Sequence, residues 1–129
     1  MKILIVDDHA ETKCMGIIEE CKKRGIVVEV KKGRNSALRR IAYEEQDIDG
    51  IVLDMGIPIL DDGFPEERGG DSVLRELQRK KYNIPVLIFS TTESNYKDKC
   101  NFVVDQMGEW NIVQEEEKFF KFLEKIEEQ

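Results

Sequence analysis

The most constraining feature of this sequence is a short aliphatic run that ends in a carboxylate. Residues 51–53 read Ile-Val-Leu and Asp54 follows them, with a glycine and a proline soon afterwards. A continuous aliphatic run of this kind is typical of a strand in a parallel sheet that helices cover on both faces. In open α/β sheets, ligands bind outside the carboxyl ends of the strands. The sequence therefore predicts that Asp54 lies where a ligand binds.

A second aliphatic run, over residues 3–6, ends in two adjacent acids, Asp7 and Asp8. If this strand lies beside the strand that ends at Asp54, three carboxylates converge at one edge of the sheet. Such a cluster is unfavourable unless protons or a hard cation offset the charge repulsion. We therefore expect the three acids to form a magnesium site.

Along the rest of the chain, the hydrophobic period alternates between that of strands and that of helices. Further strands are predicted over residues 27–30, 84–89 and 102–104. Helices are predicted over residues 11–24, from residue 71 onward and over residues 112–128, with a short helix over residues 91–99. Leu38 and Ile41 mark a further helix. Asn35 or Ser36 is its expected N-cap. Gly25 is expected to end the first helix in a left-handed conformation. Five strands alternating with five helices predict an α/β fold, a doubly wound parallel sheet of order 2-1-3-4-5 with helices on both faces.

Composition and charge limit the possible functions. With 129 residues and 40% hydrophobic content, residues 1–129 are expected to form a single domain with a proper core. The net charge of -7 and the pI near 4.9 argue against nucleic-acid binding, which needs clustered lysine and arginine. The start of the chain lacks a signal-peptide pattern, and no apolar run approaches the length of a membrane span. We expect a cytoplasmic protein without nucleic-acid or membrane partners.

The three cysteines are Cys14, Cys21 and Cys100, and none belongs to a C-x-x-C pair. They are therefore expected to be reduced thiols. The favoured interpretation is that they are small core side chains, and redox sensing is the alternative.

Three segments follow one another along the chain: I-L-I-V-D-D, D-G-I-V-L-D-M-G-I-P and I-P-V-L-I-F-S. With them, nearly the whole sequence resembles the receiver domain of two-component response regulators, which has a flavodoxin-like fold. By this resemblance, Asp54 matches the phosphate-accepting aspartate, and Asp7 and Asp8 match the acid pair that holds Mg²⁺. The backbone carbonyl of Gly56 would complete the metal site, and Ser90 matches the hydroxyl that contacts the phosphoryl group.

The resemblance also implies a biological role. It indicates a signalling domain in a phosphorelay rather than an enzyme, with self-catalysed phosphotransfer at most. The implied partners are a sensor histidine kinase or phosphotransfer protein, which supplies the phosphoryl group, and a downstream protein that the domain binds.

The sequence departs from the family at the end of the fifth strand. Receivers carry a lysine there, and the aligned residue in this chain is Asp105, so the cation that would pair with the phosphoryl group is missing. Asp105 is expected to make Asp54 a poor phosphate acceptor. Alternatively, Arg68 could supply the charge from the segment 59–70, which is longer than this connection usually is in the family. That segment is a solvated surface insertion in the favoured interpretation and a lid over the acids in the other.

Three functional hypotheses follow. The favoured one is a receiver domain that accepts a phosphoryl group on Asp54 and signals by binding a partner. The alternative is a pseudo-receiver, a protein interaction module that works without phosphorylation, and Asp105 favours it. A metal-dependent phosphatase or nuclease is disfavoured, because Met55 and Gly56 follow Asp54 and no second acid completes a D-x-D motif.

Overall fold

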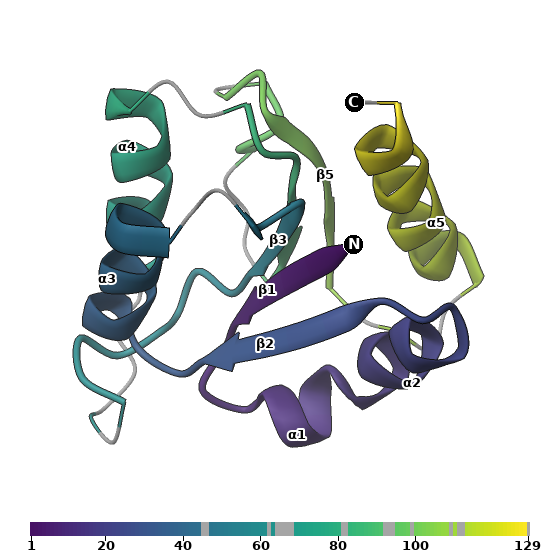
Figure 1. Cartoon of the computed structure of the whole chain (residues 1–129), viewed down its shortest axis with the longest axis horizontal. Helices are drawn as coiled ribbons and strands as arrows, with labels where there is room; N and C mark the ends of the chain where they lie inside the picture. The colour runs from purple at the N-terminus through teal and green to yellow at the C-terminus, as the bar shows by residue number, and fades with distance from the viewer. Residues whose placement is uncertain are drawn as a thin grey trace.

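Five short strands form the centre of the molecule (Figure 1). In the computed structural model they are β1 (Lys2–Val6), β2 (Val27–Lys31), β3 (Gly50–Leu53), β4 (Val86–Phe89) and β5 (Val103–Met107). Neighbouring strands all pair in parallel, and the order is β2-β1-β3-β4-β5, which confirms the predicted sheet. The residues that the structure describes are 1–44, 47–61, 63, 69–80, 83–91, 95–98, 100–108, 110 and 113–128.

Helices cover both faces of the sheet, as predicted. They are α1 (Ala10–Lys13), α2 (Met15–Lys23), α3 (Arg34–Glu44), α4 (Asp71–Arg79) and α5 (Val113–Glu127). Figure 1 shows α3 and α4 on one face, and α1, α2 and α5 on the other. Within the described segments, no helix has the length and apolar character needed to cross a bilayer.

Each face of the sheet has its own hydrophobic core, because side chains alternate along a strand. On the α3 and α4 face, Ile41 and Leu77 pack against the sheet and are fully buried. On the other face, Ile17, Phe119 and Phe122 are equally buried. Burying each of these side chains contributes about 1.5–3 kcal/mol relative to leaving it exposed. The two cores hold the strand ends in a fixed relation.

The first predicted helix is divided into two. Its residues form α1 and α2, which meet at Cys14, where the backbone has φ -98° and ψ 12°. Gly25 then ends α2 with a φ of 71°, as predicted. Its N–H donates to the carbonyl of Lys22 (3.2 Å), and the N–H of Ile26 donates to the carbonyl of Cys21 (2.9 Å). This is the Schellman arrangement, which favours glycine at the left-handed position.

The predicted N-cap of α3 is wrong. The helix already begins at Arg34, so Asn35 and Ser36 lie inside its first turn. The N–H groups of Arg34 and Asn35 donate to the carbonyls of Pro58 (2.8 Å) and Ile59 (3.0 Å). Backbone carbonyls from the β3–α4 connection thus take the place of a capping side chain. Residues 58 and 59 are fixed against α3 in this way.

The connection between β4 and β5 also differs from the prediction. A short helix was expected over residues 91–99. Of the described residues there, 97 and 98 form a turn and 91, 95 and 96 have no regular secondary structure, while residues 92–94 and 99 lie outside the described part of the chain. In the same region, β5 continues to Met107 rather than ending at Val104. The pairing with β4 shifts by one residue between Val86 and Leu87, which marks a β-bulge.

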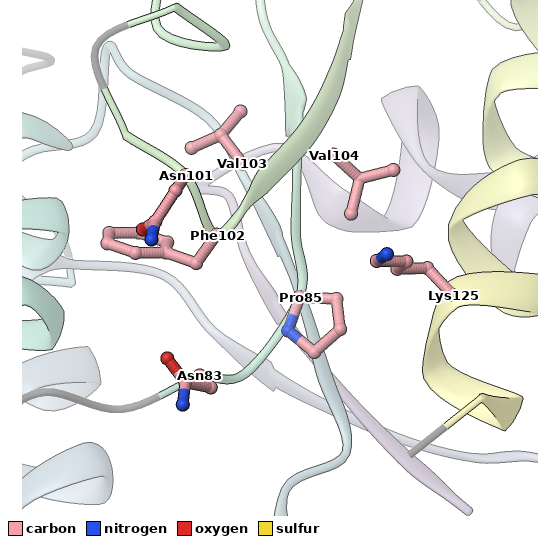
Figure 2. A pocket seen from close by; sticks show the side chains of 7 residues that line it. All are labelled: Asn83, Pro85, Asn101, Phe102, Val103, Val104 and Lys125. Atoms are coloured by element: carbon pink, nitrogen blue, oxygen red, sulfur yellow. The ribbon is translucent and has the colours of Figure 1, made fainter.

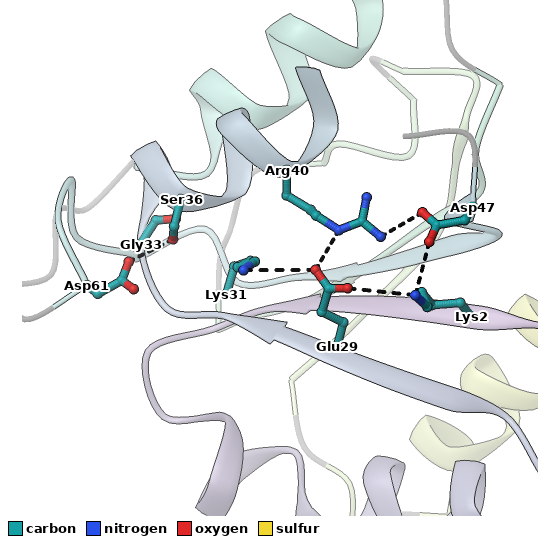
Figure 3. A network of polar contacts seen from close by, with 8 residues as sticks. All are labelled: Lys2, Glu29, Lys31, Gly33, Ser36, Arg40, Asp47 and Asp61. Atoms are coloured by element: carbon teal, nitrogen blue, oxygen red, sulfur yellow. Dashed lines mark hydrogen bonds and ion pairs between the residues drawn. The ribbon is translucent and has the colours of Figure 1, made fainter. Parts of the chain in front are cut away.

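A polar network joins β1, β2 and α3 on one side of the sheet (Figure 3). The side chain of Arg40 is 5% exposed, and its guanidinium donates to Glu29 (2.5 Å) and Asp47 (2.6 Å). Lys2 reaches the same Asp47 at 3.0 Å. The hydrogen bond from Arg40 lowers the pKa of the Asp47 carboxyl below its usual value. This network satisfies a buried cation and ties helix to sheet.

Candidate functional site

Three carboxylates converge at the carboxyl edge of the sheet. Asp7 follows β1 and Asp54 follows β3, and the two strands pair in parallel with Val6 opposite Leu53. One carboxylate oxygen from each of Asp7, Asp8 and Asp54 lies within 4.8 Å of the other two. The side chains of these three acids are 2%, 11% and 14% exposed. Clustered carboxylate oxygens of this kind are the ligands that Mg²⁺ prefers, so the residues fit that ion.

Backbone N–H groups hold two of the acids in place. Asp7 Oδ1 accepts a hydrogen bond from the N–H of His9 (2.8 Å), and Asp54 Oδ1 accepts one from the N–H of Gly56 (3.2 Å). Each acid therefore bonds the backbone two residues further on, as in an Asx-turn. The N–H of Asp54 in turn donates to the carbonyl of Val6 (2.9 Å). The turns after β1 and β3 are thus built around the two carboxylates.

A lysine also enters this cluster, and it comes from α1. Lys13 Nζ lies 2.9 Å from Asp7 Oδ2 and 3.5 Å from Asp54 Oδ1. It donates to the carbonyl of Phe89 at 2.5 Å and lies 4.8 Å from the centre of the Phe89 ring. The lysine side chain is 28% exposed. An ammonium therefore bridges the carboxyl ends of β1, β3 and β4.

Sequence reasoning missed Lys13, although the sequence carries a signal for it. Lys13 lies on the helical stripe of Ala10, Cys14, Ile17 and Cys21, all of which are buried. The helix that carries Lys13 starts just after the acid pair. A lysine on its core-facing side must therefore extend its ammonium either towards those acids or along the surface to solvent. Here it is directed towards the acids.

Comparison with solved structures shows which proteins have a similar fold. The receiver domain of the Francisella response regulator 1452 matches with 28% identity and a TM-score of 0.56, over 74% of this chain and 70% of that one. A putative response regulator from Chloroflexus aurantiacus matches with 18% identity and a TM-score of 0.69, over 99% and 98% of the two chains. The Thermotoga maritima response regulator TrrA, solved in complex with Mg²⁺ and BeF, matches with 19% identity and a TM-score of 0.66, over 94% and 97%. The chain has the fold of a response-regulator receiver domain.

No protein-family model matches the sequence, and no curated protein matches it either. The likeness to receiver domains is therefore one of structure more than of sequence. It agrees with the order of the strands in the sheet.

In this receiver fold, Ser90 lies directly after β4, beside the strand that delivers Asp54. Its N–H donates to the carbonyl of Met107 (3.0 Å), so the backbone at Ser90 is fixed to the end of β5. The preceding residue, Phe89, supplies the carbonyl that binds Lys13. Ser90 is therefore adjacent in the chain to a residue that contacts the cluster.

Asp105 does not follow β5, contrary to the sequence-based alignment. The strand continues to Met107, and Asp105 lies inside it, opposite Leu87. The bulge leaves Val104 without a partner on β4, and the strand continues for two residues beyond Asp105. The carboxylate of Asp105 accepts a hydrogen bond from the N–H of Gln106 (2.9 Å). The residue that follows the strand is Gly108.

Arg68, the possible substitute for the missing lysine, lies outside the described residues. The first described residues of the segment 59–70 contact α3 rather than the acids. Ser36 Oγ donates a hydrogen bond to Asp61 Oδ1 there (2.7 Å, Figure 3). The described end returns to the site, where the N–H of Gly70 donates to the carbonyl of Met55 (2.9 Å). A lid formed by this segment remains a prediction.

Described residues line a cleft near each end of the sheet. One has a volume of about 500 Å³ and opens beside Lys13, with Phe89, Gly108 and Trp110 in its wall. The other, of about 410 Å³, lies where β4 and β5 begin, and Figure 2 shows Pro85 and Lys125 on its sides. Only the first lies at the carboxyl edge, where the acids are.

Proposed function

We propose that this chain is a response-regulator receiver that accepts a phosphoryl group on Asp54 with Mg²⁺ and signals by binding a protein partner. The observation that carries the proposal is the convergence of Asp7, Asp8 and Asp54 within 4.8 Å. The phosphoryl donor would be a sensor histidine kinase or a phosphotransfer protein. The domain would act as a signalling switch rather than as an enzyme with a diffusible substrate.

Asp54 has the geometry of a nucleophile with one oxygen held and one available. Oδ1 accepts from Gly56 and faces Lys13, whereas the contacts described above leave Oδ2 unused. An Oδ2 lone pair would form the new O–P bond while the bond from phosphorus to the donor breaks. The donor, a phosphohistidine or an acyl phosphate, leaves with that electron pair.

Asp7, Asp8, Asp54 and the carbonyl of Gly56 would hold the magnesium ion. Bound there, the ion would neutralise charge between the acids and the incoming phosphoryl group. Three carboxylates and one ammonium leave a formal charge of two negatives, which one divalent cation balances. Ser90 would donate its hydroxyl to a phosphoryl oxygen.

Beryllofluoride, which mimics a phosphoryl group on a carboxylate, tests this proposal without a cognate kinase. With Mg²⁺ present, fluorine NMR of the wild type is expected to show a bound resonance. Asp54→Asn and Asp8→Asn should each lose it, because one removes the acceptor and the other a metal ligand. Circular dichroism would check that both variants fold.

The second candidate is a pseudo-receiver that binds partners without phosphorylation. The observation in its favour is that Gly108, not a lysine, follows β5. Under this alternative, the wild type would show no bound resonance at saturating Mg²⁺ and beryllofluoride, and that result would reject the phosphoacceptor proposal.

A further inference from the structure

We propose that Lys13, carried by α1, is the cation of the phosphoacceptor site in this chain. The inference rests on the proposed function, and it assigns to a helix residue the charge that the family takes from the end of β5. Lys13 would pair with Asp7 and Asp54 in the resting state and would contact a phosphoryl oxygen once Asp54 is modified. It would balance charge in that reaction by direct contact with the transferred phosphoryl group.

The ammonium of Lys13 is held by several polar groups at once. Its ammonium has three N–H donors, and it meets Asp7 Oδ2 at 2.9 Å, the Phe89 carbonyl at 2.5 Å and Asp54 Oδ1 at 3.5 Å. Asp7 is almost wholly buried, so the acid of this ion pair is shielded from the solvent that weakens exposed pairs. The ring of Phe89 adds a cation–π contact at 4.8 Å.

The neighbours of Lys13 fix its approach. Ala10 and Cys14 on the same stripe are fully buried, and Cys14 Sγ lies 3.6 Å from the same Asp7 Oδ2. The helix is therefore anchored on both sides of Lys13. The lysine stem spans from this anchored turn to the ends of β3 and β4.

Lys118, a cation on α5 near the end of β5, is paired with other groups. Lys118 on α5 donates to the carbonyl of Gln106 (2.8 Å) and pairs with Glu115 (3.1 Å). Among the described residues, Lys13 is the lysine whose ammonium reaches both Asp7 and Asp54. Lys13 therefore lies where it can replace the lysine that receivers carry at the end of the fifth strand.

The proposal predicts effects of opposite sign on two ligands. A positive charge among the acids repels a divalent cation, so Lys13→Met should bind Mn²⁺ more tightly, by roughly tenfold. The same charge attracts a phosphoryl oxygen, so Lys13→Met should bind beryllofluoride with Mg²⁺ at least tenfold more weakly. A residue that served only folding would weaken both ligands together.

Calorimetry with Mn²⁺ and fluorine NMR with beryllofluoride would measure the two effects. Lys13→Arg keeps the charge and should restore much of the beryllofluoride binding. Lys22→Met is the matched control, because it removes one exposed charge from α2 and should change neither ligand. If Lys13→Met does not fold by circular dichroism, Lys13→Gln replaces it.

The outcomes separate this inference from the proposed function. Wild-type binding of beryllofluoride together with unchanged binding by Lys13→Met would overturn the role of Lys13 and leave Asp54 as acceptor. If the wild type binds no beryllofluoride, the phosphoacceptor function fails and so does the role of Lys13 in it. Mn²⁺ affinity that is equal in the wild type and Lys13→Met would overturn the claim that Lys13 balances the charge of the acids.

Discussion

Asp7 is the residue on which the site depends most, because it is 1% exposed and charged groups are rarely buried without partners. It receives three donors, the N–H of His9, the thiol of Cys14 and the ammonium of Lys13. Each donor comes from the first seven residues after Asp7. The turn after β1 therefore both delivers this acid and stabilises it.

The cysteine thiols give a prediction at this scale. Burial, and then the charge of Asp7, raises the pKa of Cys14 to about 12, and burial raises that of Cys21 to about 11. Both thiols should be inert to alkylation at pH 8 in the native protein, which agrees with core side chains rather than redox sensors. Mass spectrometry after iodoacetamide treatment, with and without urea, would check this. Rapid native labelling of Cys14 would contradict it.

The same pKa values predict a pH dependence of stability. The folded state holds these thiol protons more tightly than the unfolded state, whose thiols titrate near pH 9. The free energy of unfolding should therefore fall as the pH rises from about 9 towards 11. Each thiol should contribute a loss of up to about 1.4 kcal/mol for each pH unit. Urea unfolding of the wild type and of Cys14→Ala/Cys21→Ala would isolate this slope. Identical slopes in the two proteins would contradict the prediction.

Residue by residue, the sequence could predict the acids but not their cation. Asp7, Asp8 and Asp54 each follow an aliphatic run, and strand ends meet at a sheet edge. Helical spacing places Lys13 on the face of the acids, but it does not tell how far the lysine stem reaches. Asp105 was misplaced because a β-bulge leaves no mark in the hydrophobic pattern.

At the scale of elements, the break between α1 and α2 brings a glycine under the single tryptophan. A Cβ on Gly16 would lie 2.0 Å from Trp110 Nε1, so the indole covers the backbone of α2 there. Trp110 also meets the ring of Phe119 edge-on, with centroids 5.5 Å apart. The segment that leads into α5 is thereby attached to α2, beside the cleft that opens at Lys13.

Gly16→Ala should displace Trp110 from α2. Alanine alone would favour the helix by about 1 kcal/mol, but overpacking against the indole costs about 1–3 kcal/mol, so a loss of stability is expected. The tryptophan emission should shift to longer wavelength as the ring gains solvent. Lys23→Ala, on the exposed side of α2, is the control. Unchanged emission in Gly16→Ala would show that the indole does not rest on this glycine.

The sequence predicted every strand, because apolar runs between turn residues are a local signal. The errors lie where partners from distant segments decide the outcome. The N-terminus of α3 is capped by the carbonyls of Pro58 and Ile59, which no local pattern reveals. The length of β5 depends on its pairing with β4, and the polar stretch over residues 91–99 gave a helix prediction that its described residues do not support.

For the whole molecule, the order β2-β1-β3-β4-β5 explains why the site lies where it does. It puts β1 and β3 side by side. The chain leaves β1 towards β2 on one side and leaves β3 towards β4 on the other, so a crevice opens between the two strand ends. The alternation of strands and helices made this order predictable before any contact was known. What it leaves open is which residue supplies the positive charge, because several elements end at the same edge of the sheet.

The central claim is that Asp54 accepts a phosphoryl group in a magnesium-dependent reaction. Intact-protein mass spectrometry after incubation with Mg²⁺ and a small acyl phosphate tests it most directly. The account predicts that the wild type gains the mass of one phosphoryl group, that chelating the metal prevents the gain, and that Asp54→Asn gains nothing. A wild type that gains no mass, or an Asp54→Asn variant that gains as much as the wild type, would contradict it.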